Sequence, residues 1–305
     1  MKNIQADIKS GNFKQVYLLY GEEAYLKQQY KQNLVKALNP DGDTMNFNHY
    51  EGKGIDVKQL IDLCETMPFF AERRVVLLED TGFFKNKCEE LADYMKELPD
   101  YLYLVFAETE VDKRNRMYKA VKSCGSIAEF IRQDEKTLMR WAAGILGKAG
   151  KKITQRDMEL LLTKTGTDMG NLRMEMEKLI SYTEGRDVVT AEDIEEICTT
   201  QTTNRIFDMV RAVTEKNQKR ALELYYDLLT LKEPPMRILF LLAKQYRQLL
   251  LAKQFAAAGL AQTEIASKLG VPGFVEKNIT TCARAYAISE LEQAVKDFVD
   301  AEESV

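Results

Sequence analysis

The first 133 residues alternate short hydrophobic runs with stretches whose hydrophobic residues recur at helical spacing. The runs predict five strands, at residues 16–20, 45–50, 74–79, 101–107 and 126–130. The stretches between them predict helices, one ending near residue 38 and others at 56–66 and 85–96. Because parallel strands are joined by helical crossovers of this length, the pattern predicts βαβ units and a parallel sheet.

After residue 133 the strand signal largely stops and helical spacing dominates. Residues 134–202 predict a small helical domain, and residues 203–305 predict a second, all-helical domain. The longest predicted helix of that domain covers residues 236–257 and is opened by a proline pair, which suits a first helical turn. The polar run at 199–204 predicts a linker between the two helical domains.

Length and charge narrow the class of protein. A chain of 305 residues suits two or three domains, and its hydrophobic content of 45% is ordinary for a folded protein. Its net charge of -4 gives no reason to expect a strongly basic nucleic-acid binder. We see no N-terminal signal region and no hydrophobic run long enough to cross a bilayer, so we expect no membrane partner.

Cysteine and histidine usage argues against several kinds of site. The five cysteines lie far apart without a C-x-x-C pair, which fits reduced thiols in a cytoplasmic protein better than disulfides or a zinc site. His49 is the only histidine, so a Ser-His-Asp triad or a multi-histidine metal site is nearly excluded. We therefore expect no catalytic triad and no metal; we expect no other catalytic residues and no cofactor either.

The turn after the first predicted strand is where a nucleotide-binding α/β protein carries its phosphate loop. A working loop, G-x-x-x-x-G-K-[ST], cradles phosphates with backbone N–H groups and holds Mg²⁺ with its Ser or Thr. This chain keeps Gly21 but places Glu22 and Glu23 where the phosphates would lie. It lacks the second glycine, and Lys27 is followed by Gln28. Since carboxylates repel phosphates, we interpret the turn as a degenerate nucleotide loop.

Three stretches resemble the delta subunits of the bacterial DNA polymerase III clamp loader, a non-ATPase branch of the AAA+ family. Residues 16–26, VYLLYGEEAYL, resemble the opening of that family. Residues 170–179, GNLRMEMEKL, resemble its lid signature, and residues 233–250, which run from EPP to RQLL, resemble the long helix of its third domain. The resemblance covers essentially the whole chain in the expected order. Family members usually run somewhat past Val305, so we expect a shortened final helix.

The resemblance implies a fold, a function and a set of partners. The fold is an AAA+-like α/β domain at 1–133, a helical lid at 134–202 and an oligomerising helical collar at 203–305. Delta subunits do not hydrolyse ATP; they bind the sliding clamp, which is the beta subunit, and promote opening of its ring. The other implied partners are the loader's ATPase subunits, delta-prime, and primed DNA within the assembled loader. The chain would be classed with DNA-directed DNA polymerase only as a holoenzyme subunit.

An aromatic pair, Phe69 and Phe70, lies between the second predicted helix and the third predicted strand. From the residues alone, packing of both rings against the sheet edge is the more common outcome, since hydrophobic side chains are usually inside. In delta subunits, however, this position carries a hydrophobic pair that enters a pocket on the clamp. The resemblance therefore implies a clamp-binding element made of Met67, Pro68, Phe69 and Phe70. A second pair, Phe83 and Phe84, has the same composition, and we interpret it as local packing.

Two groups of basic residues could contact DNA phosphates or neighbouring subunits. They are Lys113, Arg114 and Arg116 near the end of the α/β part, and Arg237, Lys244 and Arg247 on the long helix. Such charges bind DNA without sequence preference, although a solvated helix face of mixed charge is the ordinary alternative. Two other functions stay open at this point, an AAA+ ATPase with a degenerate loop and a helical scaffold of unrelated function.

Overall fold

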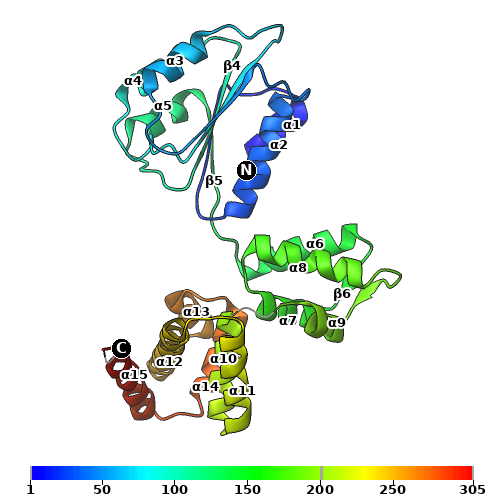
Figure 1. The fold of residues 1–305 in the computed structure, drawn as a ribbon, viewed down its shortest axis with the longest axis vertical. Coiled ribbons are helices and arrows are strands. Elements are labelled where there is room, and N and C mark those ends of the chain that lie inside the picture. The colour runs from blue at the N-terminus through cyan, green and yellow to red at the C-terminus, as the bar shows by residue number, and fades with distance from the viewer. Residues whose placement is uncertain (1, 200–201, 304–305) are drawn as a thin grey trace. The chain divides into compact units, whose positions relative to one another are not determined.

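The computed structural model of the chain describes residues 2–199 and 202–303, drawn in Figure 1. The chain separates into two compact units, Met1–Gln133 and Asp134–Val305. Each unit has its own buried hydrophobic clusters. No helix in these described residues is both long and hydrophobic enough to cross a membrane.

The first unit is built on a five-stranded sheet in which all neighbouring strands are parallel. The strands lie in the order β2-β3-β4-β1-β5, and their bounds are β1 Val16–Tyr20, β2 Phe47–Glu51, β3 Arg74–Glu79, β4 Leu102–Glu108 and β5 Ser126–Glu129. The predicted parallel sheet is confirmed. Its strands read as hydrophobic runs because both faces of a parallel sheet are covered.

Helices cover both faces of this sheet (Figure 1). They are α1 Lys2–Ser10, α2 Ala24–Leu38, α3 Val57–Glu65, α4 Glu89–Tyr94 and α5 Arg116–Cys124. Val16, Leu18 and Tyr20 of β1 face a core that α3, α4 and α5 share. Tyr17 and Leu19 face the opposite core, which α1 and α2 cover. The period of two along β1 therefore divides its side chains between two buried layers.

One helix of this unit differs from the sequence prediction in its bounds. The predicted helix at 85–96 is wrong in its first part, since α4 begins only at Glu89. The N–H groups of Lys85 and Asn86 donate to the Gly82 carbonyl oxygen, at 3.0 and 2.9 Å. These bonds form a turn that brings the buried rings of residues 83 and 84 into the core, and the helix begins after it.

In its described residues, the second unit is helical apart from one short pair of strands. Its helices are α6 Glu135–Lys148, α7 Gln155–Thr165, α8 Met169–Tyr182, α9 Ala191–Ile197, α10 Thr202–Thr214, α11 Gln218–Thr230, α12 Pro235–Ala257, α13 Gln262–Leu269, α14 Gly273–Ala283 and α15 Ile288–Glu303. The helical character predicted for this part is confirmed. The start of α9 shows a complete capping box, in which Thr190 and Asp193 exchange side-chain bonds to backbone N–H groups.

Three features were not predicted from the sequence, and one of them is the helix α5 that precedes β5. Helix α1 has too few buried residues to give a clear pattern; Ile4 and Ile8 supply its hydrophobic side. The second unit contains a parallel pair of two-residue strands, β6 Lys152–Ile153 and β7 Val188–Val189. Strands this short carry no readable alternation.

The predicted linker at 199–204 falls partly on regular structure. Residues 202–204 belong to α10, and residues 200 and 201 lie outside the described residues. The division of this unit into a lid at 134–202 and a collar at 203–305 stays a prediction. Within residues 203–305, α12 is the central helix, and it packs against α10, α13, α14 and α15.

Two glycines bracket the contact between β1 and β5. A Cβ atom added to Gly21 would lie 2.3 Å from the Phe130 carbonyl oxygen, and one added to Gly125 would lie 2.3 Å from that of Val16. Gly21 also has a φ of +124°, a conformation that residues with side chains rarely adopt. Gly21 is thus required by the close approach of two backbones, independently of any phosphate.

We predict that Gly21→Ala destabilises the protein by at least about 2 kcal/mol, because it combines backbone strain with overpacking against a carbonyl. Urea denaturation would measure this change. Gly125→Ala is the control for the steric clash alone, and Gly11→Ala, at φ +74° with open space around it, is the control for backbone strain alone. A Gly21→Ala variant no less stable than Gly11→Ala would contradict the proposed clash.

Candidate functional site

The turn after β1 is closed by the end of β5. The Phe130 N–H donates to the Tyr20 carbonyl oxygen at 2.7 Å, and the Phe130 carbonyl oxygen accepts from the Glu23 N–H at 2.9 Å. In a phosphate loop, amides of this turn point toward phosphate. Here the Glu23 amide is already bonded within the protein. Glu22 is exposed and Glu23 is buried, so the two carboxylates lie in different surroundings.

Lys27 occupies the edge of the sheet where its strand order reverses, between the carboxyl ends of β1 and β4. Open α/β sheets bind their ligands at this place. The Lys27 Nζ donates to the Glu108 carbonyl oxygen at 2.9 Å and lies 3.4 Å from the Thr109 Oγ1. Burial lowers the pKa of Lys27, and nearby carboxylates oppose that shift. This lysine is therefore bonded to the end of β4, where a phosphate-binding lysine would meet its ligand.

Carboxylates at the same edge of the sheet are also bonded within the protein. Glu79 lies 2.6 Å from the Lys31 Nζ and 2.9 Å from the His49 Nε2. Glu108 accepts from the N–H and hydroxyl of Thr81, and burial raises the pKa of its carboxyl. In the described residues, no group of three or more His, Cys, Asp or Glu side chains could hold a metal ion. The sequence analysis missed these acids, although an acid at the carboxyl end of a buried strand was a readable signal.

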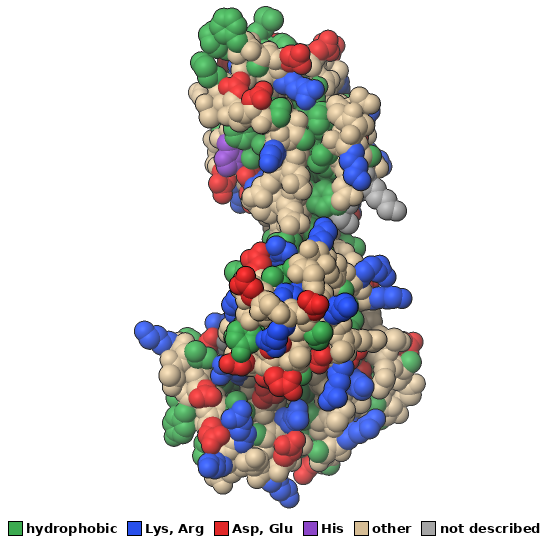
Figure 2. Space-filling model, turned by 90° about the vertical axis from the view of Figure 1, so that its right-hand side faces the viewer, with side chains coloured by type: hydrophobic (Ala, Val, Ile, Leu, Met, Phe, Trp, Pro, Cys, Tyr) green, Lys and Arg blue, Asp and Glu red, His purple; other side chains and the backbone are tan. Residues whose placement is uncertain are grey.

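The predicted clamp-binding element forms an exposed loop between α3 and β3. The exposed fraction is 75% for Met67, 56% for Phe69 and 95% for Phe70. The two rings meet edge to face, with their centroids 4.5 Å apart. Hydrophobic side chains project from the upper end of the first unit as drawn in Figure 2. The alternative, in which both rings pack against the sheet edge, does not describe this structure.

Two buried polar side chains fix the backbone of this loop. Asn46 accepts from the Phe69 N–H at 2.6 Å and donates to the Phe69 carbonyl oxygen at 2.8 Å. The Arg74 guanidinium donates to the carbonyl oxygens of Thr66 at 2.8 Å and Met67 at 3.3 Å. Both Asn46 and Arg74 lie at the amino ends of neighbouring strands, β2 and β3. The loop is therefore displayed at the opposite edge of the sheet from the degenerate nucleotide loop.

Sequence reasoning missed the two side chains that fix this loop, Asn46 and Arg74, which it assigned only to strands. Their roles depend on β2 and β3 being neighbours, which no local pattern states. The rival aromatic pair is settled as local packing, because Phe83 and Phe84 are buried in the core.

The first group of predicted basic contacts is paired with carboxylates. Lys113 bonds Glu129 at 2.8 Å, Arg114 bonds Asp112 at 3.1 Å, and Arg116 bonds Asp93 at 2.6 Å. On the long helix α12, Arg237 pairs with Glu233 at 3.2 Å. Within residues 2–199 and 202–303, Lys244 and Arg247 form no ion pair. The structure does not bring the two groups of basic residues together within one unit.

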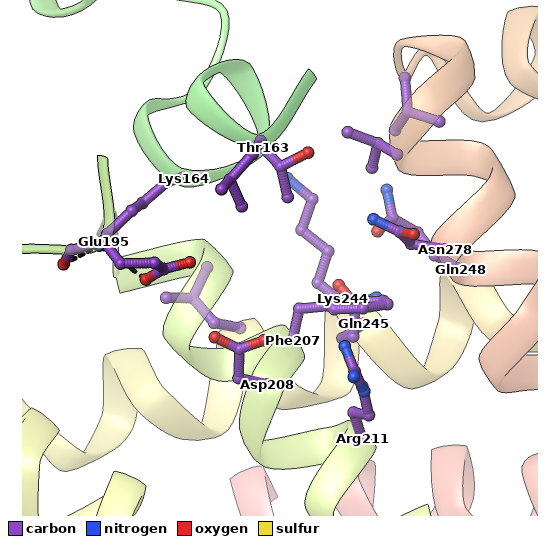
Figure 3. Close-up of a pocket in the computed structure, with 14 residues that line it drawn as sticks. Thr163, Lys164, Glu195, Phe207, Asp208, Arg211, Lys244, Gln245, Gln248 and Asn278 are labelled. Carbon is purple, nitrogen blue, oxygen red and sulfur yellow. Dashed lines mark hydrogen bonds and ion pairs between the residues drawn. The ribbon is translucent and has the colours of Figure 1, made fainter. Parts of the chain in front are cut away.

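Lys244 lines a cavity of about 370 Å³ in the second unit (Figure 3). In that view its side chain extends from α12 toward Thr163 of α7. Nearby, Gln245 is buried, and its Nε2 has no hydrogen-bond partner in the part of the chain that the structure describes. The charged residues that line the cavity are Lys164, Arg211, Lys244, Glu195 and Asp208. Because they carry both signs of charge, the lining favours no particular class of ligand.

Comparison with known proteins settles the family. A family model described as DNA polymerase III, delta subunit, matches residues 17–130, and one described as the C-terminal domain of that subunit matches residues 203–305. The chain belongs to the DNA polymerase III delta subunit family. The family resemblance seen in the sequence is thereby confirmed.

Individual relatives agree with this assignment. The chain is 26% identical to DNA polymerase III subunit delta of Bacillus subtilis, over 95% of this chain and 87% of that protein. It is 21% identical to the probable DNA polymerase III subunit delta of Aquifex aeolicus, over 92% of this chain and 83% of that one. The solved Bacillus subtilis DNA clamp loader delta protein shares the fold, with a TM-score of 0.66 and 23% identity over 99% of this chain and 93% of that chain.

Family membership makes the chain a clamp-loader delta subunit of DNA polymerase III, a component of the DNA replication machinery. As a loader subunit, it assembles with other subunits of that loader. The expected fold, an AAA+-like α/β part followed by helices, is confirmed.

We predict that the full chain shows no saturable binding of Mg-ATP in calorimetric titration up to millimolar nucleotide. The physical reason is that the Glu23 amide and the Lys27 ammonium are already bonded within the protein. Saturable binding that Lys27→Ala abolishes would contradict this prediction. That outcome would favour the alternative of an ATPase with a degenerate loop.

Proposed function

We propose that this delta subunit binds the sliding clamp through Met67, Pro68, Phe69 and Phe70 and promotes opening of the clamp ring for loading onto primed DNA. The observation that carries the proposal is the exposed pair of phenylalanines on a loop whose backbone is fixed by buried side chains. Adjacent exposed aromatic residues commonly mark a protein interface, and aromatic residues commonly dominate its energy.

The aromatic pair can supply a substantial binding energy. Burying one phenylalanine side chain contributes about 1.5–3 kcal/mol, so two rings contribute roughly 3–6 kcal/mol. The edge-to-face contact between the rings and the fixed backbone beneath them reduce the conformational entropy that binding would cost. The two rings therefore suit insertion into a pocket as a single wedge.

Ring opening requires that the wedge bind the open clamp more tightly than the closed one. A ligand shifts an equilibrium only by its difference in affinity for the two states. Moving a ring from 1% open to 99% open needs a difference of about 5.5 kcal/mol. Two buried rings reach that value only if nearly all of their contact is restricted to the open form. We propose that the clamp edge beside its own subunit interface bends to accept the wedge.

The subunit performs this work without hydrolysing ATP itself. Its closed turn after β1 supports this part of the proposal, since the groups that would hold phosphates are bonded within the protein. ATP bound by other subunits of the loader would then control when the wedge is available to the clamp.

The named loader partners are proposed from family membership. They are the ATPase subunits and delta-prime, with primed DNA bound in the assembled loader. Exposed hydrophobic side chains on the C-terminal helices support contacts with neighbouring subunits. Leu222 and Tyr226 on α11, and Met236 and Phe240 on α12, are exposed and lie four residues apart, so each pair shares one side of its helix.

A contact with DNA or a neighbouring subunit by basic side chains is proposed for Lys244 and Arg247 before the other candidates. Lys113, Arg114, Arg116 and Arg237 already have carboxylate partners, which reduces the charge that they offer to a phosphate. Exposed ion pairs are weak, however, so all six residues remain candidates that phosphate could recruit.

The test is calorimetric titration of the full chain and of the Phe69→Ala/Phe70→Ala variant with the cognate sliding clamp. We expect the variant to bind at least about 100-fold more weakly, because roughly 3 kcal/mol or more of ring burial is lost. Circular dichroism should show an unchanged fold, since both rings are exposed.

A matched control is Met236→Ala/Phe240→Ala, which removes an exposed hydrophobic pair from the second unit. This control should bind the clamp like the unmodified chain. Equal binding by the Phe69→Ala/Phe70→Ala variant would place the clamp contact elsewhere. No binding by the unmodified chain would remove the proposed function and leave only the family assignment.

A further inference from the structure

We infer that Asn46 is the positioning residue that holds the Phe69–Phe70 wedge in its clamp-binding conformation before the clamp arrives. This inference rests on the proposed function of the wedge and concerns a residue of another loop. Asn46 itself is 4% exposed, so it is not available as a contact residue. It acts on the clamp only through the backbone of Phe69.

The side chain of Asn46 bonds both backbone polar groups of Phe69. Its Oδ1 accepts from the Phe69 N–H at 2.6 Å, and its Nδ2 donates to the Phe69 carbonyl oxygen at 2.8 Å. A primary amide is well suited to this task, since it combines one acceptor with two donors on one planar group. Aspartate cannot donate, and alanine can do neither. The loop between α3 and β3 thereby gains the two hydrogen bonds that a paired strand would otherwise supply.

Asn46 can hold the loop because its own position is fixed. Its second Nδ2 hydrogen is donated to the Asp43 carboxylate. Its backbone carbonyl oxygen accepts from the Val75 N–H at 2.9 Å. Asp43 is tied in turn to Asn39 through two bonds of 2.9 Å. The Val75 bond belongs to the ladder between β2 and β3. The sheet therefore sets where Asn46 lies, and Asn46 sets where Phe69 lies.

The backbone of Phe70 shows why such support is needed. Phe70 has a φ of +51°, in the left-handed region that residues with side chains rarely adopt. Strained conformations of this kind persist only where neighbouring contacts enforce them, and they gather at functional sites. The bonds of Asn46 to Phe69, and those of the Arg74 guanidinium to Thr66 and Met67, hold the segment that leads into this conformation. The turn at Phe70 directs the exposed ring outward, beside that of Phe69.

The experiment compares Asn46→Ala with the unmodified full chain in two measurements. Amide hydrogen exchange, followed by NMR at the Phe69 N–H in the free protein, should accelerate by about tenfold or more, because the acceptor of that N–H is lost. Calorimetric titration with the cognate clamp should show binding about tenfold weaker, as the loop must then be ordered at the moment of binding.

Asn115→Ala is the matched control for loss of a structural asparagine in the same unit. Asn115 also bonds three backbone groups, those of Phe83, Asn86 and Met117, and touches none of the wedge. It should lower stability as Asn46→Ala does, yet bind the clamp within about twofold of the unmodified chain. If Asn115→Ala weakened clamp binding as much as Asn46→Ala, a general loss of stability would explain both, and the inference would be overturned.

A double-mutant cycle separates positioning from an independent effect. Asn46→Ala should weaken clamp binding much less in a Phe70→Ala background, because disorder of the loop costs less binding free energy once the Phe70 ring is absent. Strict additivity would overturn the inference.

Failure of the inference and failure of the proposed function are distinguishable. If the Phe69→Ala/Phe70→Ala variant loses clamp binding while Asn46→Ala retains it, the wedge stands and the positioning role is wrong. If the Phe69→Ala/Phe70→Ala variant binds normally, the proposed function is wrong, and the positioning role falls with it.

Discussion

The complete burial of β1 is the constraint on which both ends of the α/β unit depend. Its five residues alternate between two cores, so the strand can neither slide nor rotate without exposing hydrophobic side chains. β4 and β5 pair directly with β1, and β3 and β2 follow outward. Every loop at either edge of the sheet is positioned relative to this strand.

Because all the strands are parallel, the two edges of the sheet collect different kinds of loop. At the carboxyl edge, polar groups turn inward: the Glu23 amide bonds Phe130, Lys27 bonds the end of β4, and Glu79 bonds Lys31. At the amino edge, Asn46 and Arg74 use their hydrogen bonds to hold hydrophobic rings outward. At the carboxyl edge, these polar groups form hydrogen bonds within the protein, whereas the amino edge exposes hydrophobic side chains to solvent. This division fits a protein that engages a partner at one edge and no nucleotide at the other.

The degenerate nucleotide loop illustrates how far sequence reasoning reached. The missing glycine and the two glutamates predicted, from local sequence alone, that the turn would not serve as a phosphate loop. The reason for Gly21 was different from the one that the motif suggests. Gly21 is needed because the carbonyl group of Phe130, more than a hundred residues away in sequence, lies where a Cβ atom would be. The local motif predicts a glycine at this position but carries no information about the contact with Phe130.

The sequence by itself determined most strands and helices and the parallel sheet, because hydrophobic period is a local property of the chain, and its resemblance to delta subunits indicated the family. It could not separate Phe69 and Phe70 from Phe83 and Phe84 without a family resemblance, since both pairs follow hydrophobic segments and have the same composition. The tertiary structure decided between them. Phe83 and Phe84 close a turn over the core, whereas Phe69 and Phe70 are held away from it by Asn46, a residue of a different loop. Whether a hydrophobic side chain is exposed depends on which segments pack beside it. Here the pairing of β2 with β3 places Asn46 beside Phe69, and that contact exists only in the folded chain.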